Sequence, residues 1–127
     1  GYVGHLITSK LLLSYLKKDK AKVLDAGCGT GLVGELLFNN NFKNVEGVDF
    51  SEEMLSIASN KKVYQSLKLV DLTKKLDYKD SVFDAVICAG TFTCGHVGPE
   101  ALRELVRIKR WVYLFYCKKT GVGSCTL

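Results

Sequence analysis

The sequence predicts a doubly wound α/β domain, with a Rossmann-like parallel sheet and helices on both of its faces. Short apolar runs alternate with amphipathic stretches at helical spacing, and the segments between them are short. Glycines gather directly after the first predicted strand. Right-handed crossovers place helices on both faces of such a sheet, and ligands bind beyond the carboxyl ends of its strands. The loops at that edge therefore contain the candidate functional site.

Helices and strands alternate through the first half of the chain. Residues 5–18 place leucine and isoleucine at helical spacing and end in lysines, which suit the negative end of a helix dipole. Residues 22–26 form a short apolar strand that is followed by glycines. Residues 31–40 have one apolar helical face and end in asparagines, and residues 44–49 follow as the second strand.

The second half continues the alternation. Ser51 is a favourable N-cap, with acidic residues in the first turn of the helix that it begins. Residues 65–70 are the third predicted strand. Residues 82–88 are an almost uninterrupted apolar run, typical of a strand that is buried on both faces. Pro99 opens the last predicted helix.

The composition excludes several classes of protein and partner. The 127 residues are 47% apolar and 24% charged, which is typical of soluble globular domains. No apolar run approaches the roughly 18 residues of a membrane span, so we expect a cytoplasmic protein without a membrane partner. The net charge is +5, but residues 1–108 hold fourteen basic and thirteen acidic residues, a balance of +1. A nucleic-acid partner is therefore not expected.

The cysteines indicate neither disulfides nor a metal site. The five cysteines are an odd number and contain no Cys-x-x-Cys pair, which is typical of reduced thiols. Cys94 and His96 are close in sequence, but His5 is the only other histidine and a metal site needs three or four ligands. We therefore expect no bound metal.

The glycine loop is compatible with two classes of ligand. Gly27, Gly29 and Gly31 alternate after the first strand, where a missing Cβ lets the backbone approach a ligand. Gly29, Gly31 and Gly34 match the dinucleotide pattern G-x-G-x-x-G, and Asp49 follows Gly29 by twenty residues, as a ribose-binding acid does. This spacing predicts a nicotinamide dinucleotide (NAD) module as one reading.

Asp25 favours the other class of ligand. A carboxylate directly before the glycines would repel a pyrophosphate, which carries two negative charges. A ligand with cationic groups and no phosphate suits this position better. S-adenosylmethionine, with an amino group, a sulfonium, a ribose and an adenine, is such a ligand.

Four stretches of the chain resemble class I S-adenosylmethionine-dependent methyltransferases. They are the D-x-G-x-G-x-G stretch at 25–31, Gly-Val-Asp-Phe-Ser at 47–51, Val-Asp-Leu at 70–72 and Phe-Asp-Ala-Val-Ile-Cys-Ala-Gly at 83–90. Within the class, the motifs around 29–35, 47–55 and 95–97 are similar to the methyltransferase-like group of the Williams–Beuren syndrome chromosome region. The resemblance covers residues 2–108 and implies an enzyme that transfers a methyl group from S-adenosylmethionine.

The resemblance implies a role for each matching position. Asp49 binds the ribose hydroxyls, Asp25 lies near the amino group, and His96 is a candidate base in the acceptor loop. The positions implied for donor binding are Tyr2, Asp25, Gly27, Gly29, Gly31, Asp49, Phe50, Met54, Asp71, Leu72, Ala89 and Gly90. Asp49 and Asp71 also have a structural interpretation as strand-end acids, Met54 as a core side chain and His96 as a surface residue.

The resemblance stops after residue 108. Residues 109–127 form an atypical, acid-free tail with two interpretations: a fifth strand over 111–117, or the product of a shifted reading frame. Four or five strands of a seven-stranded family sheet are then present, so residues 1–108 are expected to be the donor-binding part of a larger domain. The methyl acceptor, a small molecule or a protein, is not identified. A non-catalytic fragment or pseudoenzyme stays an alternative.

Overall fold

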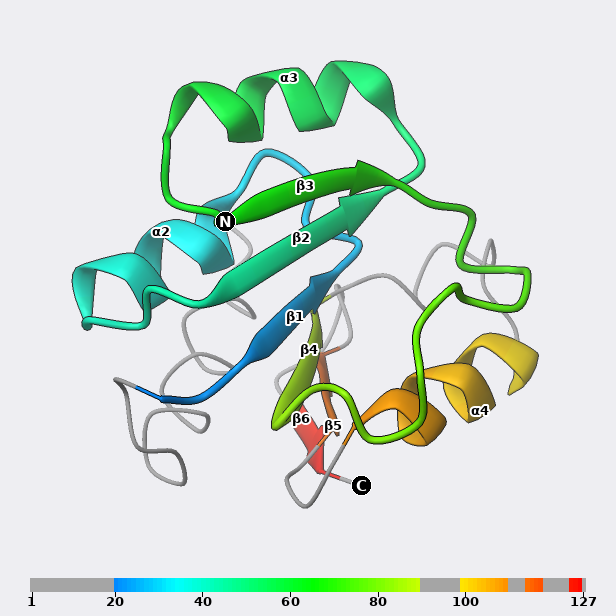
Figure 1. Ribbon diagram of the computed structural model, residues 1–127. Coiled ribbons are helices and arrows are strands. Elements are labelled where there is room, and N and C mark those ends of the chain that lie inside the picture. Colours follow the sequence, from blue (N-terminus) through cyan, green and yellow to red (C-terminus); the bar gives the residue numbers. More distant parts are fainter. Residues whose placement is uncertain (1–19, 90–98, 110–113, 118–123, 127) are drawn as a thin grey trace.

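A computed structural model, in which residues 20–89, 99–109, 114–117 and 124–126 are described, confirms the doubly wound α/β fold (Figure 1). The elements in chain order are β1 (Val23–Ala26), α2 (Leu32–Asn39), β2 (Val45–Asp49), α3 (Glu52–Asn60), β3 (Ser66–Leu69), β4 (Ala85–Ala89), α4 (Pro99–Ile108), β5 (Leu114–Cys117) and β6 (Ser124–Thr126). The helix predicted over residues 5–18 lies outside the described residues.

The sheet has the strand order β3-β2-β1-β4-β5-β6. Strands β1 to β5 pair in parallel, and β6 pairs antiparallel with β5. The chain winds outward from β1 first through β2 and β3, and then through β4 and β5. The strand order therefore reverses at β1, which is where ligands bind in folds of this kind.

The tail contributes two strands where the sequence predicted at most one. β5 lies within the predicted strand over 111–117, but β6 was not predicted, because its three residues carry little apolar signal. Only residues 118–123 separate the two strands. A parallel crossover needs a dozen or more residues, so β6 pairs antiparallel, which a shorter connection allows.

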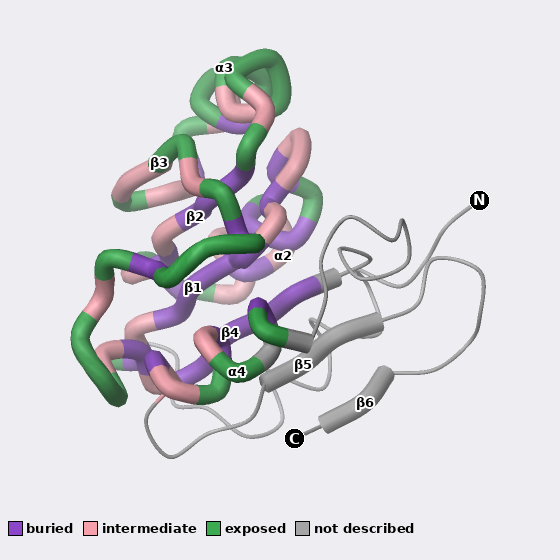
Figure 2. Tube along the Cα trace, turned by 90° about the vertical axis from the view of Figure 1, so that its right-hand side faces the viewer, coloured by how far each residue is buried: buried purple, intermediate pink, exposed green. Residues whose placement is uncertain are grey.

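The two faces of the sheet have separate apolar cores. Val23, Val45 and Ile87 face the side of α2, where they pack with Leu37. The alternate residues of the same strands pack against α4 and the segment before β4; the fully buried members are Leu24, Ala26, Val48, Phe83, Val86, Cys88, Leu105 and Ile108. Figure 2 shows β1, β2 and β4 as the buried centre of the described fold.

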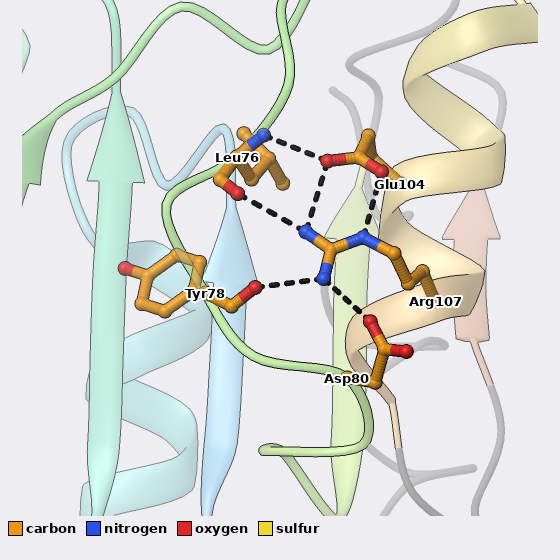
Figure 3. Close-up of polar contacts among 5 residues, drawn as sticks. All are labelled: Leu76, Tyr78, Asp80, Glu104 and Arg107. Carbon is orange, nitrogen blue, oxygen red and sulfur yellow. Dashed lines mark hydrogen bonds and ion pairs between the residues drawn. The ribbon is translucent and has the colours of Figure 1, made fainter.

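An arginine on α4 holds the segment before β4 (Figure 3). The Arg107 guanidinium donates to the carbonyl oxygens of Leu76 and Tyr78, at 3.0 and 2.7 Å. It also pairs with Asp80 at 2.8 Å and with both carboxylate oxygens of Glu104 at 2.8 and 2.9 Å. Glu104 in turn accepts from the Leu76 N–H at 2.8 Å. This network fixes the segment of residues 76–80 to α4 on that side of the sheet.

Candidate functional site at the carboxyl edge of the sheet

The glycine loop leaves β1 with its backbone open to a ligand. Gly27, Gly29 and Gly31 have φ angles of 71°, 57° and 94°, in the left-handed region that favours glycine. A Cβ built on Gly29 would meet no atom within 4 Å. Gly29 is therefore required for its backbone conformation, and the space beside it is free of described protein atoms.

Asp49 at the end of β2 ties the glycine loop to its neighbouring strand. Its side chain is 7% exposed, and Oδ2 accepts from the Gly29 N–H at 2.8 Å. Oδ1 accepts from the Ser51 N–H at 3.0 Å. A carboxylate oxygen has two lone-pair sites, so each oxygen of Asp49 retains one for a further donor. Two neighbouring hydroxyl groups are donors of the kind that this arrangement can bind.

Asp25 is more deeply buried than its neighbour. Its side chain is 1% exposed, and Oδ2 accepts a hydrogen bond of 2.6 Å from the hydroxyl of Tyr64. Burial raises the pKa of Asp25 to about 7, although the Tyr64 hydrogen bond opposes the rise and the charge of Asp49 adds to it. The expected location of Asp25 near a ligand's amino group stays a prediction.

Apolar side chains stand exposed beside Asp49. Phe50 is 70% exposed and Met54 is 40% exposed. The hydroxyl of Ser51 accepts from the Met54 N–H at 3.3 Å, which confirms Ser51 as the N-cap of α3. The exposure of Met54 does not support its interpretation as a core side chain. Phe50 and Met54 thus provide exposed apolar surface beside the carboxyl end of β2.

Asp71 lies one residue beyond Val70, whose N–H donates to the carbonyl oxygen of Asp49 at 2.8 Å. Its Oδ1 accepts from the N–H and the hydroxyl of Thr73, at 2.9 and 2.5 Å, and these bonds lower the pKa of Asp71. The carboxylate is exposed, whereas the Leu72 side chain is buried on the α4 side. The Asp71 side chain thus stabilises the turn over residues 71–73 through its Oδ1 atom.

The structure brings together the predicted site residues at the ends of β1, β2 and β3. Other predicted site residues lie outside the described part of the chain. β1, β2 and β3 are parallel neighbours in the sheet, so the glycine loop after β1, Asp49 at the end of β2 and Asp71 after β3 lie along the same edge. Ala89 is the last residue of β4, which pairs with β1. Tyr2, Gly90 and His96 lie outside the described residues.

The charge at this edge is not compensated by the basic side chains of the described segments. Ion pairs among the described residues include those of Lys61 with Glu35, Lys68 with Glu46, and Arg107 with Asp80 and Glu104. None of them includes Asp25 or Asp49. The described segments also contain no group of three histidine, cysteine or acidic side chains that could hold a metal ion. A cationic organic ligand suits two such carboxylates.

Sequence reasoning missed Tyr64, which lies between α3 and β3. A Cβ on Gly34 would come within 2.2 Å of the Tyr64 ring, and one on Gly47 within 3.0 Å of it. Gly47 sits inside a central strand, where glycine often marks the close approach of another group. That glycine was the available signal for a ring packed on the strand. The third glycine of the dinucleotide pattern, Gly34, is thereby explained without a dinucleotide.

The family of the chain follows from comparison with known proteins. Residues 24–111, more than half of the chain, match a family model described as a methyltransferase domain. The chain belongs to this methyltransferase family. The matched segment contains the glycine loop, Asp49 and Asp71.

Curated relatives share the same part of the chain. Methyltransferase-like protein 27 of Homo sapiens is 40% identical over 86 residues, which are 67% of this chain and 35% of that protein. EEF1A lysine methyltransferase 2 of Danio rerio is 30% identical and aligns with 68% of this chain and 39% of its own. The 18S rRNA (guanine-N(7))-methyltransferase of Bos taurus is 38% identical, over 51% of this chain and 23% of its own. The chain thus spans little more than a third of the length of the first two.

A solved structure supports the family assignment. The crystal structure of a SAM-dependent methyltransferase from Aquifex aeolicus superposes with a TM-score of 0.68 at 28% identity, covering 86% of this chain and 62% of that one.

Within the described part of the present chain, no helix has the length and apolar character that crossing a membrane requires.

Proposed function

We propose that this chain is the donor-binding part of a methyltransferase that uses S-adenosylmethionine. The observation that carries the proposal is the pair of buried carboxylates, Asp25 and Asp49, without an ion-pair partner among the described residues, beside the open backbone of Gly29. S-adenosylmethionine supplies a methyl group on a cationic sulfonium, together with an amino group and no phosphate. Membership of the methyltransferase family supports the same ligand.

Each side chain at the edge then has a role in holding the donor. Asp49 accepts both ribose hydroxyls on its remaining lone pairs, each charge-assisted bond contributing on the order of 1.5–3 kcal/mol. Phe50 and Met54 flank the adenine with their exposed apolar surface. The further proposed donor contacts are Tyr2, Gly27, Gly29, Gly31, Asp71, the Leu72 backbone, Ala89 and Gly90.

Methyl transfer from a sulfonium needs alignment more than acid–base chemistry. The leaving group departs neutral, so the protein has to orient donor and acceptor and exclude water. We propose a small molecule or a protein as acceptor, since the near-neutral balance of residues 1–108 does not favour a nucleic acid. His96 is the proposed base for an acceptor that must lose a proton. A cytoplasmic location is part of this proposal.

The alternative function is NAD binding, for which the spacing of Gly29, Gly31, Gly34 and Asp49 is the specific observation. Two structural features weaken it. Gly34 is accounted for by the Tyr64 ring, and the buried Asp25 adds a second carboxylate where a pyrophosphate would lie.

Equilibrium binding of S-adenosylhomocysteine and of NADH to the full chain, by calorimetry at pH 7.5, separates these functions. We expect binding of S-adenosylhomocysteine and weaker or no binding of NADH. Tighter binding of NADH would contradict the proposal. Binding of neither compound would favour a non-catalytic fragment or pseudoenzyme.

A further inference from the structure

Tyr64 occupies a slot that glycines create at the side of α2. In register, Asp25 of β1 lies opposite Gly47 of β2, and Gly47 opposite Leu67 of β3. A Cβ on Gly47 would come within 2.7 Å of Leu67 and within 3.0 Å of the Tyr64 ring. The absence of that Cβ leaves room for the ring beside the strand.

The α2 helix closes the slot with a second glycine. A Cβ on Gly34 would lie 2.2 Å from Cζ and 2.4 Å from the hydroxyl oxygen of Tyr64. A Cβ on Gly31, directly before α2, would lie 3.3 Å from the edge of the Tyr64 ring, which is closer than an ordinary van der Waals contact. Any larger residue at Gly34 would displace the end of the Tyr64 side chain that carries the hydroxyl.

Among the described residues, the Tyr64 hydroxyl is the side-chain hydrogen-bond donor to the Asp25 carboxylate. Tyr64 donates to Asp25 at 2.6 Å, and Asp25 is 1% exposed. A buried carboxylate without a donor is costly, so the tyrosine hydroxyl supplies what a phenylalanine at the same position would not. The groups whose charge or polarity bears on Asp25 are Tyr64, Asp49 and the buried thiol of Cys28.

We propose that Tyr64 is a positioning residue of the donor site, holding the Asp25 carboxylate beneath the glycine loop from its slot between Gly34 and Gly47. This inference rests on the proposed function, because it assigns Tyr64 to the binding of the donor. Tyr64 acts through Asp25 and the start of the loop rather than by touching the donor. The negative charge of Asp25, fixed in this way, favours a cationic ligand above the loop.

Tyr64→Phe tests the hydroxyl while it keeps the ring in the slot. The full chain is titrated with S-adenosylhomocysteine by calorimetry at pH 7.5. In the ligand-free chain, the Asp25 carboxyl carbon is followed by ¹³C NMR against pH. We expect the dissociation constant to rise about tenfold and the Asp25 midpoint to move upward by about one pH unit or more, because the carboxylate loses its donor.

Tyr78→Phe is the matched control. The Tyr78 hydroxyl also donates to a carboxylate, that of Glu46, but on the α4 side of the sheet. Removing it should leave both the dissociation constant and the Asp25 midpoint at their wild-type values. Thermal unfolding of both variants verifies that each remains folded at the temperature of the titration.

Gly34→Ala provides a second test that does not depend on the hydroxyl. Alanine is normally favoured over glycine inside a helix, so ordinary helix propensity predicts a higher melting temperature. The slot predicts the opposite: a lower melting temperature and weaker binding of S-adenosylhomocysteine. A more stable variant with wild-type affinity would overturn the slot.

The outcomes for Tyr64→Phe separate this inference from the proposed function. If the wild-type chain binds S-adenosylhomocysteine and Tyr64→Phe leaves either the affinity or the Asp25 midpoint unchanged, the positioning role alone is overturned. Failure of the wild-type chain to bind S-adenosylhomocysteine would overturn the proposed function, and the positioning role with it. Loss of affinity together with the upward midpoint supports both.

Discussion

Two tyrosine–carboxylate pairs on opposite faces of the sheet have opposite electrostatic consequences. Tyr64 donates to Asp25 on the α2 side, and Tyr78 donates to Glu46 on the α4 side. Burial raises the pKa of Asp25 to about 7 despite its hydrogen bond. The pKa of Glu46 is lowered, because hydrogen bonds from Ser66 and Tyr78 and the charge of Lys68 together outweigh its partial burial.

The difference lies in the remaining neighbours of each carboxylate. Glu46 is partly open to water and 3.6 Å from the ammonium of Lys68, whereas Asp25 is covered and next to the like charge of Asp49. A single tyrosine hydroxyl does not offset the desolvation of a fully buried carboxylate. On the α4 side, hydrogen bonds and basic side chains of the protein thus stabilise the charged form of the carboxylates. At the glycine loop, a cationic ligand would supply that stabilisation.

Asp25→Asn probes the strongest consequence of this contrast. The folded pKa of about 7 exceeds the ordinary value of 3.8, so the folded chain binds a proton more tightly than the unfolded chain. Wild-type stability therefore falls as pH rises from about 4 to 7, by as much as about 4 kcal/mol. The asparagine variant lacks this loss, so we expect it to be more stable than wild type at pH 8 in urea unfolding. The gain should disappear near pH 4, and a variant less stable at pH 8 would contradict the contrast.

Arg107→Ala removes the positive charge that binds backbone carbonyls and carboxylates on the α4 side of the sheet. The guanidinium bonds two backbone carbonyls and two carboxylates, of which the Glu104 carboxyl has its pKa lowered to about 2 by Arg107 and the Leu76 N–H. We expect a loss of about 2–3 kcal/mol in urea unfolding at pH 7. The affinity for S-adenosylhomocysteine should stay within about twofold of wild type, because the network lies away from the glycine loop. A large loss of affinity would break the separation between the two regions.

Asp49→Ala removes a carboxylate from the proposed ligand-binding edge. The alanine variant loses the acceptor of the Gly29 and Ser51 N–H groups and of the proposed ribose hydroxyls. We expect the dissociation constant for S-adenosylhomocysteine to rise at least about tenfold, or 1.4 kcal/mol, in calorimetry. An unchanged constant would remove Asp49 from the site.

Glu46→Gln should have the smallest effect. Glutamine keeps one oxygen and puts an amide NH2 in place of the other, so one of the Ser66 and Tyr78 hydroxyls has to accept from that amide instead of donating. The attraction of Lys68, which is more than half exposed, is also lost. We expect a loss below about 1 kcal/mol at pH 7, opposite in sign to Asp25→Asn and decreasing in acid as the wild-type carboxyl is protonated. Urea unfolding at pH 7 and pH 3 measures it; a gain of stability at pH 7 would show that Glu46 resembles Asp25.

The sequence predicted the parts of this molecule that local patterns determine. The apolar run at residues 82–88 indicated a buried central strand, and β4 is one, although it begins at Ala85 because Phe83 pairs instead with Lys109 in an isolated bridge. Ser51 indicated the start of α3, and its hydroxyl does cap that helix. Such signals depend on neighbours within a few residues, which a single sequence displays.

Contacts between distant segments could not be predicted in the same way. The slot for Tyr64 joins Gly34, Gly47 and Asp25, which are up to 39 residues from it, and no local periodicity links them. β6 is too short and polar to carry a strand signal, and its pairing depends on β5 alone. The assignments of Tyr2, Gly90 and His96 stay predictions.

The location of donor binding is tested most directly by amide NMR of the full chain during titration with S-adenosylhomocysteine. We predict that the largest shifts fall at residues 27–31, 49–54 and 71–72, along the carboxyl edge of β1, β2 and β3. The amides of Glu104 and Arg107 on α4 should change little. Shifts concentrated on α4, or none at saturating ligand, would contradict the account.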